Sequence, residues 1–130
     1  MILADTSAWV EYLRATGSAV HARLRTALTG AELAVCDAVR MEVLAGARGE
    51  RRLRDLHRLL ARAATLETLP SDYDAAASIY RSCRRHGETP RSLTDCLIAA
   101  IAIRCGVTVL QADRDFGAIA RHSTLQAITG

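Results

Sequence analysis

The feature that most constrains the fold is an acidic residue followed by an uninterrupted apolar run. Asp95 precedes eight apolar residues, Cys96 to Ile103, and Gly106 comes shortly afterwards. Ser92 is a good helix N-cap and Gly106 a good helix end, so the run is predicted to form a helix. A helix that is apolar on every side is buried. Other elements must therefore surround this helix, and Asp95 lies near its N-terminal end.

Short apolar runs alternate with helical patterns along the rest of the chain. Strands are expected at residues 1–4, 33–36, 65–69, 107–110 and 125–128. Helices are expected to begin near Ala8, Ser18, Asp37, Glu50, Ser71, Ser92 and Asp115. Asp37 and Asp74 are expected to cap their helices. This alternation predicts an α/β fold around a mostly parallel sheet, and 130 residues suit one domain spanning residues 1–130.

The basic residues exclude several kinds of chemistry. All 17 of them are arginine, so no lysine is present for a P-loop or a Schiff base. An aspartate-nucleophile phosphatase is also disfavoured, because it requires Asp-x-Asp after the first strand and a later lysine, whereas this chain has Asp5-Thr6-Ser7. The net charge of +3 permits an anionic partner without demanding one.

Cysteine and histidine spacing gives no sign of zinc binding or thiol catalysis. The four cysteines form no C-x-x-C pair, and the four histidines are scattered. No apolar run approaches the roughly 20 residues that cross a bilayer. The first residues lack the basic region of a signal peptide. A cytoplasmic, soluble protein without membrane contact is expected.

Four acidic residues stand out by their positions. Asp5 ends the first expected strand, and Asp113 follows the strand at 107–110. Because the carboxyl ends of parallel strands share a crevice, these two residues are expected to lie together. Glu42 lies in a helix between apolar Met41 and Val43. Each acid also has a plain structural explanation: a turn, a solvent-exposed position, or, for Asp95, a helix cap of the Ser92-x-x-Asp95 type.

Convergence of these carboxylates would require a cation. Like charges a few ångströms apart raise one another's pKa values and destabilise the fold. All-oxygen ligand sets select hard ions, here Mg²⁺ or Mn²⁺. A carboxylate site of this type is typical of phosphodiester cleavage, where the ion polarises the phosphate and stabilises the leaving oxygen.

Arginine clusters supply positive charge for a phosphate backbone. Seven arginines fall between Arg40 and Arg62, and a second group surrounds Arg85. Each set has two explanations, a solvated helix face or phosphate contacts. The candidates for RNA contact are Arg40, Arg48, Arg51, Arg52, Arg85, Arg91 and Arg114.

Four segments in order resemble the PIN-domain family, and within it the VapC-type toxins of toxin–antitoxin pairs. They are Ile2-Leu3-Ala4-Asp5-Thr6-Ser7-Ala8, Glu42-Val43-Leu44, Ser92-Leu93-Thr94-Asp95-Cys96-Leu97-Ile98-Ala99-Ala100 and Asp113-Arg114-Asp115-Phe116. The match covers the whole chain. Two positions depart from the usual pattern: Met41 before Glu42, and Gln111 before the fourth acid.

The resemblance implies a three-layer α/β/α sandwich and a Mg²⁺- or Mn²⁺-dependent endoribonuclease that cuts structured RNA, such as tRNA or ribosomal RNA, and thereby stops translation. It assigns the catalytic and metal-binding roles to Asp5, Glu42, Asp95 and Asp113. Supporting roles fall to Thr6, Ser7 and Asp115. It also implies a homodimer and a cognate antitoxin, through which alone the toxin meets DNA. The alternative function is a non-catalytic RNA- or protein-binding module of the same fold.

Overall fold

A five-stranded sheet lies at the centre of the computed structural model, which describes residues 1–130. Its strands are Ile2–Ala4 (β1), Leu33–Cys36 (β2), Ala64–Leu66 (β3), Thr108–Leu110 (β4) and Ala127–Ile128 (β5). The spatial order is β3-β2-β1-β4-β5, and every neighbouring pair is parallel. The predicted parallel sheet is therefore confirmed, with no antiparallel strand.

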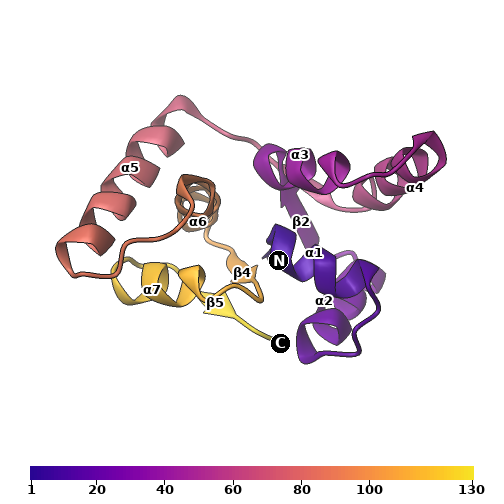
Figure 1. The fold of residues 1–130 in the computed structure, drawn as a ribbon, viewed down its shortest axis with the longest axis horizontal. Helices are drawn as coiled ribbons and strands as arrows, with labels where there is room; N and C mark the ends of the chain where they lie inside the picture. Colours follow the sequence, from indigo (N-terminus) through magenta and orange to yellow (C-terminus); the bar gives the residue numbers. More distant parts are fainter.

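Seven helices cover the two faces of this sheet. They are Thr6–Leu13 (α1), Ala19–Thr29 (α2), Asp37–Ala45 (α3), Glu50–Leu60 (α4), Pro70–Arg85 (α5), Leu93–Cys105 (α6) and Asp115–Arg121 (α7). Helices α5, α6 and α7 lie on one side, and α1 to α4 lie on the other, where α4 projects outward (Figure 1). The three-layer α/β/α architecture is confirmed. None of the helices is both long and apolar enough to span a bilayer.

Helix α6 is the buried helix that the apolar run predicted. Seven of its residues are buried, from Asp95 and Cys96 near its start to Ala102 near its end. It packs against α5 and also contacts α7, α3 and β4. Gly106 ends it with a left-handed backbone (φ +67°), a conformation that glycine adopts without steric cost.

The order of the strands places a crevice beside β1. From β1 the chain moves to β2 on one side, and it returns much later to β4 on the other. The carboxyl ends of β1 and β4 are joined where the Asp5 N–H donates to the Leu110 carbonyl at 2.9 Å. Such a reversal in a parallel sheet leaves an opening between the loops that follow the two strands. Asp5 and Asp113 both occupy loops at this opening.

Two predicted helix caps were wrong. Asp37 is the first residue of α3, where Cys36 is the N-cap and no side chain caps the helix. Helix α5 begins at Pro70, because proline suits the first helical turn, where its missing N–H costs nothing. Its start is consequently capped by Asp72, which accepts from the Leu69 N–H at 2.8 Å, and not by Asp74.

Asp72 also joins two helices. It is 2% exposed, and it accepts hydrogen bonds from the Nε and Nη2 atoms of Arg104 at 2.9 and 3.0 Å. The Arg104 guanidinium keeps the pKa of the Asp72 carboxyl below its usual value, although burial opposes this effect. This ion pair fixes the start of α5 against the end of α6.

Replacement of Asp72 with Ala is expected to destabilise the protein by at least about 1 kcal/mol, the usual value of a helix cap. Asp74→Ala is the matched control, because Asp74 is exposed two residues later on the same helix, and its effect should stay within about 0.5 kcal/mol. Urea unfolding followed by circular dichroism measures both. Equal effects of the two substitutions would contradict the role of Asp72.

Candidate metal centre

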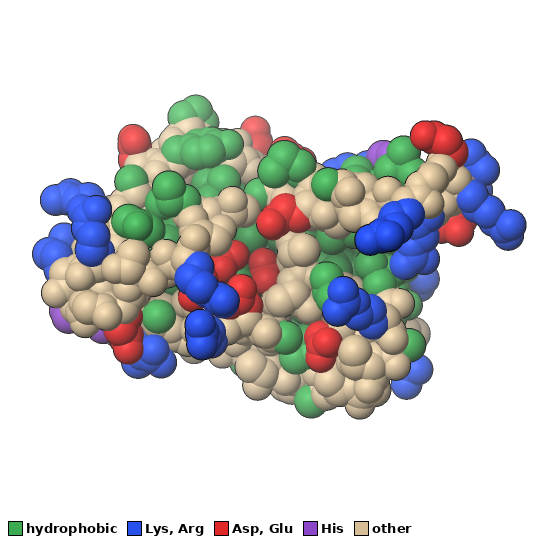
Figure 2. Space-filling view, in the orientation of Figure 1, with side chains coloured by type: hydrophobic (Ala, Val, Ile, Leu, Met, Phe, Trp, Pro, Cys, Tyr) green, Lys and Arg blue, Asp and Glu red, His purple; other side chains and the backbone are tan.

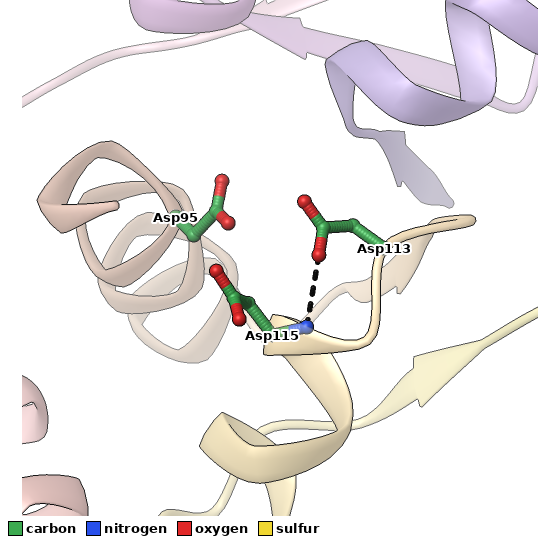
Figure 3. A group of neighbouring side chains, drawn as sticks. All are labelled: Asp95, Asp113 and Asp115. Carbon is green, nitrogen blue, oxygen red and sulfur yellow. Dashed lines mark hydrogen bonds between the residues drawn. The ribbon is translucent and has the colours of Figure 1, made fainter. Parts of the chain in front are cut away.

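Three aspartates meet where α6, the loop after β4 and α7 come together. Asp95 lies in the first turn of α6, Asp113 in the loop after β4, and Asp115 at the start of α7. One carboxylate oxygen from each lies within 4.8 Å of those of the other two. Figure 3 shows the three side chains converging on one space, with the Asp115 N–H donating to Asp113 Oδ1 at 2.9 Å. We call this group the acidic trio.

Asp5 faces the same opening from β1 and is tightly held. It is 3% exposed, and its Oδ2 accepts from the N–H and the hydroxyl of Ser7 at 3.0 and 2.7 Å. Burial raises the pKa of Asp5, although the hydrogen bonds from Ser7 oppose the rise. The Ser7 hydroxyl oxygen also accepts from the Ala112 N–H at 2.9 Å. Ser7 therefore links the loop after β1 to the loop after β4.

Glu42 completes the acidic surface from the other side of the opening. Its side chain is exposed on α3, and its Oε1 accepts from the Thr6 hydroxyl at 2.8 Å. Two of the three predicted supporting residues therefore have different partners: Ser7 donates to Asp5, and Thr6 donates to Glu42. Figure 2 shows acidic side chains gathered at the centre of this face of the molecule.

The Asp95 carboxylate lacks compensation from the protein. Its residue is 8% exposed, and its buried Oδ2 has no hydrogen-bond partner. Burial raises the pKa of Asp95 to about 7, and the negative charges of Asp5, Asp113, Asp115 and Glu42 contribute to the rise. Ser92 caps α6 by accepting from the Thr94 N–H at 3.2 Å, but no hydrogen bond returns from Ser92 to Asp95. The reciprocal capping explanation for Asp95 is therefore absent from the structure.

Gln111 is a site residue that the sequence pattern did not reveal. It is 7% exposed, and its Oε1 accepts from the Asp113 N–H at 2.7 Å. The amide thus shapes the turn that presents Asp113. The only signal in the sequence was a departure from the family pattern, and it did not identify this contact.

The donor set suits a hard divalent cation. The acidic trio and Asp5 offer only carboxylate oxygens, the ligand type that Mg²⁺ and Mn²⁺ prefer. The orphaned Oδ2 of Asp95 supports the same assignment, because a buried polar atom without a partner is costly unless something binds it. The residues present fit a divalent ion held by Asp95 and Asp113, with Asp5 beside them.

Comparison with known proteins gives the family. The family model for the PIN domain matches residues 2–122. The chain belongs to the PIN-domain family. Ribonuclease VapC11 of Mycobacterium tuberculosis is 48% identical to this PIN domain over 130 residues, which cover 98% of the chain and 97% of that protein. A VapC ribonuclease of Mycobacterium bovis shows the same identity and coverage. The predicted likeness to VapC-type PIN domains is thereby confirmed.

Solved structures show the same PIN fold at lower identity. VapBC from Salmonella typhimurium, in a DNA-bound crystal structure, superposes with a TM-score of 0.76 at 18% identity, covering 98% of this chain and 96% of that one. VapC20 of Mycobacterium tuberculosis, described as a sarcin–ricin loop cleaving toxin, has a TM-score of 0.63 at 22% identity, covering 97% and 99%. These likenesses concern the fold alone.

The candidate arginines of this PIN domain lie in several places. Arg48, Arg51 and Arg52 are exposed on or just before the projecting α4. Arg40 contacts His57 Nδ1 at 3.0 Å. Figure 2 shows basic side chains on both sides of the central acidic surface and along the α4 projection.

The remaining three candidates do not share one surface. Arg114 is exposed between the two aspartates of the loop after β4. Arg85 lines a separate cavity of about 550 Å³ between α5, α6 and the segment that follows α7, which none of the site acids borders. Arg91 lies against Asp113 and Asp115, a contact that the sequence did not indicate.

The raised pKa of Asp95 gives a prediction about pH and stability. The folded protein binds a proton at Asp95 up to pH of about 7, whereas an ordinary aspartate titrates at 3.8. Between these values the folded state holds more protons than the unfolded state, so the contribution of Asp95 to stability falls as pH rises and levels off above about pH 7.

Asp95→Asn removes this contribution. In EDTA, urea unfolding should show the variant gaining stability relative to the wild type between pH 5 and pH 8. The matched control is Asp74→Asn. Because Asp74 is exposed, the stability difference between this variant and the wild type should be the same at pH 5 and pH 8. A constant difference between wild type and Asp95→Asn at the two pH values would contradict the prediction.

Proposed function

We propose that this PIN domain is a Mg²⁺- or Mn²⁺-dependent endoribonuclease and the toxin of a toxin–antitoxin pair. The observation that carries the proposal is the unpartnered, buried oxygen of Asp95 within the acidic trio. This acidic trio occurs in a chain that is 48% identical to proteins described as VapC ribonucleases. Asp5, Glu42, Asp95 and Asp113 are the proposed catalytic and metal-binding residues.

Each acid has a role that follows from its contacts. Asp95 and Asp113 present free oxygens toward an ion, which when bound would polarise the phosphate and stabilise the leaving oxygen. Ser7 keeps Asp5 in one orientation through two hydrogen bonds. Thr6 orients Glu42 at the rim of the opening. Such fixed side chains reduce the reorganisation needed when the phosphodiester binds.

The proposed substrate is structured RNA, such as tRNA or ribosomal RNA, cut at a few sites so that translation stops. Exposed arginines beside the acidic surface supply contacts to phosphates on both sides of the cleaved bond. Hydrolysis by water leaves a 5′-phosphate and does not use the ribose 2′-hydroxyl as nucleophile. The proposed location, in the cytoplasm, follows from this substrate.

Cleavage assays with total cellular RNA test the proposal directly. The wild type in Mg²⁺ or Mn²⁺ should produce discrete new 5′-phosphate ends, found by sequencing, and EDTA should abolish them. Asp95→Asn should reduce cleavage to below about one hundredth, a common loss when one group near the reacting charge is removed. Asp74→Asn should cleave as well as the wild type, because Asp74 is exposed on α5 and belongs neither to the trio nor to the charges that act on Asp95.

The same samples distinguish the non-catalytic alternative. A binding module would give no new RNA ends, and its thermal stability would not respond to Mn²⁺. A ligand that binds only the folded state raises stability, so a metal-dependent rise in the wild type that is lost in Asp95→Asn supports the nuclease. Metal-independent cleavage, or cleavage retained by Asp95→Asn, would refute the assignment.

The proposed protein partner is a cognate antitoxin, through which alone the toxin meets DNA. Support comes from structural neighbours that are toxin–antitoxin complexes, several of them bound to DNA. A groove of about 210 Å³ between α1, α3 and α4 offers a site for a peptide segment. Its walls include Trp9, whose buried Nε1 has no partner, and Glu42 at the edge of the acidic surface. A segment in this groove would also reach the opening.

A homodimer is the proposed assembly. Three of the four exposed large hydrophobic residues, Met41, Tyr73 and Leu93, are 63%, 60% and 61% exposed. They line two adjoining cavities that share Tyr73, Thr94 and Leu97. An apolar surface of this kind is typical of an interface, and a second copy of the chain would cover it.

Light scattering during gel filtration tests the dimer. The wild type should elute at twice the 14.0 kDa chain mass, and the double variant Tyr73→Asp with Leu93→Asp should elute at the mass of one chain, because two charges would be buried unpaired. Ala22→Asp places a charge on an exposed position of α2 and should leave the dimer intact. A monomeric wild type, or a dimeric double variant, would contradict this interface.

A further inference from the structure

One guanidinium group lies against the acidic trio. Arg91 lies in the loop between α5 and α6, next to the N-cap Ser92. Its Nη2 donates to Asp113 Oδ1 at 2.9 Å, and its Nε donates to Asp115 Oδ1 at 3.4 Å. Its backbone N–H donates to Asp115 Oδ2 at 3.0 Å. One residue thus bonds to two of the three aspartates.

The hydrogen bonds are distributed unequally among the three carboxylates. Both oxygens of Asp115 accept hydrogen bonds from Arg91. Oδ1 of Asp113 accepts twice, from Arg91 and from the Asp115 N–H. The Asp95 Oδ2 has no partner at all. The guanidinium therefore compensates the charge of Asp113 and Asp115, and leaves that of Asp95 uncompensated.

The exposure of these groups indicates which contact can open. The Arg91 side chain is 59% exposed, that of Asp113 is 28% exposed, and that of Asp115 is 9% exposed. The bond from the Arg91 backbone to Asp115 does not depend on the side chain. The guanidinium can therefore leave Asp113 for solvent while the loop and Asp115 stay in place.

We propose that Arg91 is the internal counter-cation of the metal-free site, and that a divalent ion displaces its guanidinium from Asp113. The inference rests on the metal-binding part of the proposed function. Three carboxylates within 4.8 Å of one another repel, and the guanidinium offsets this repulsion until an ion arrives. Arg91 is thus a positioning residue that stabilises the metal-free fold and weakens metal affinity.

Other roles for Arg91 predict a different response of metal binding. If the side chain only kept the aspartates in place, its removal would loosen the site and weaken the affinity for metal. If it only contacted RNA, its removal would leave metal affinity in the absence of RNA unchanged. A counter-cation differs from both, because its removal strengthens metal binding.

The test is Mn²⁺ binding to RNA-free protein, measured by electron paramagnetic resonance and calorimetry at low salt. Arg91→Gln removes the charge and keeps the backbone N–H. It should bind Mn²⁺ about fivefold more tightly, a modest gain because the ion pair that is lost is partly exposed. Its metal-free form should melt at a lower temperature than the wild type and show a larger rise on adding Mn²⁺.

Two further variants control for folding and for total charge. Arg91→Lys keeps the charge without the planar fork and should restore an affinity near that of the wild type. Arg84→Gln makes the same change of charge at an exposed position on α5, where the guanidinium lies over the Tyr80 ring, and should leave Mn²⁺ affinity unchanged.

The outcomes separate this inference from the proposed function. Unchanged or weaker Mn²⁺ binding by Arg91→Gln would overturn the counter-cation role while leaving a metal-binding wild type intact. Equal strengthening by Arg84→Gln would assign the effect to net charge and overturn it as well. A wild type that binds no Mn²⁺ would refute the metal-dependent function together with this inference.

Discussion

The candidate site is arranged around one unfavourable feature, the burial of the Asp95 carboxylate in the first turn of the apolar helix α6. Helix α6 is enclosed by α5, α7, α3 and β4, so Asp95 and Cys96 near its start have little access to water. The N-terminal end of a helix favours a negative charge, but this effect is small beside the loss of hydration and the repulsion from neighbouring acids. The protein tolerates the group because stability elsewhere compensates, a pattern typical of functional sites.

The surrounding frame keeps the acids at fixed distances despite their repulsion. The Ser7 hydroxyl donates to Asp5 and accepts from the Ala112 N–H, which joins the loops after β1 and β4. Gln111 Oε1 accepts from the Asp113 backbone N–H, which fixes the turn, and the Asp115 N–H donates to the Asp113 carboxylate, which orients it. Neutral donors orient carboxylates without removing their charge. The frame therefore preserves a negative field in the opening, where lysine or arginine at these positions would cancel it.

The sequence predicted most of the fold, and it drew attention to the acids that lie around the opening, for reasons that are local. Apolar runs, caps and glycines act within a few residues, and the acid before an all-apolar helix identified Asp95. The contacts of Gln111 and Arg91 were not predictable, because they join segments that only the folded chain brings together. The choice of Asp72 over Asp74 was missed for a similar reason: its partner, Arg104, lies on another helix.

The charge pattern also links metal and RNA within the proposed function. The chain carries a net charge of +3, yet the centre of this face is acidic and its surroundings are basic. A phosphate attracted by the exposed arginines meets repulsion at the opening unless a cation lies there. Metal occupancy and RNA binding must then strengthen each other, because coupling between two ligands is reciprocal. The arginines favour the binding of a polyanion, and its phosphate can enter the acidic opening only when a divalent ion is bound there.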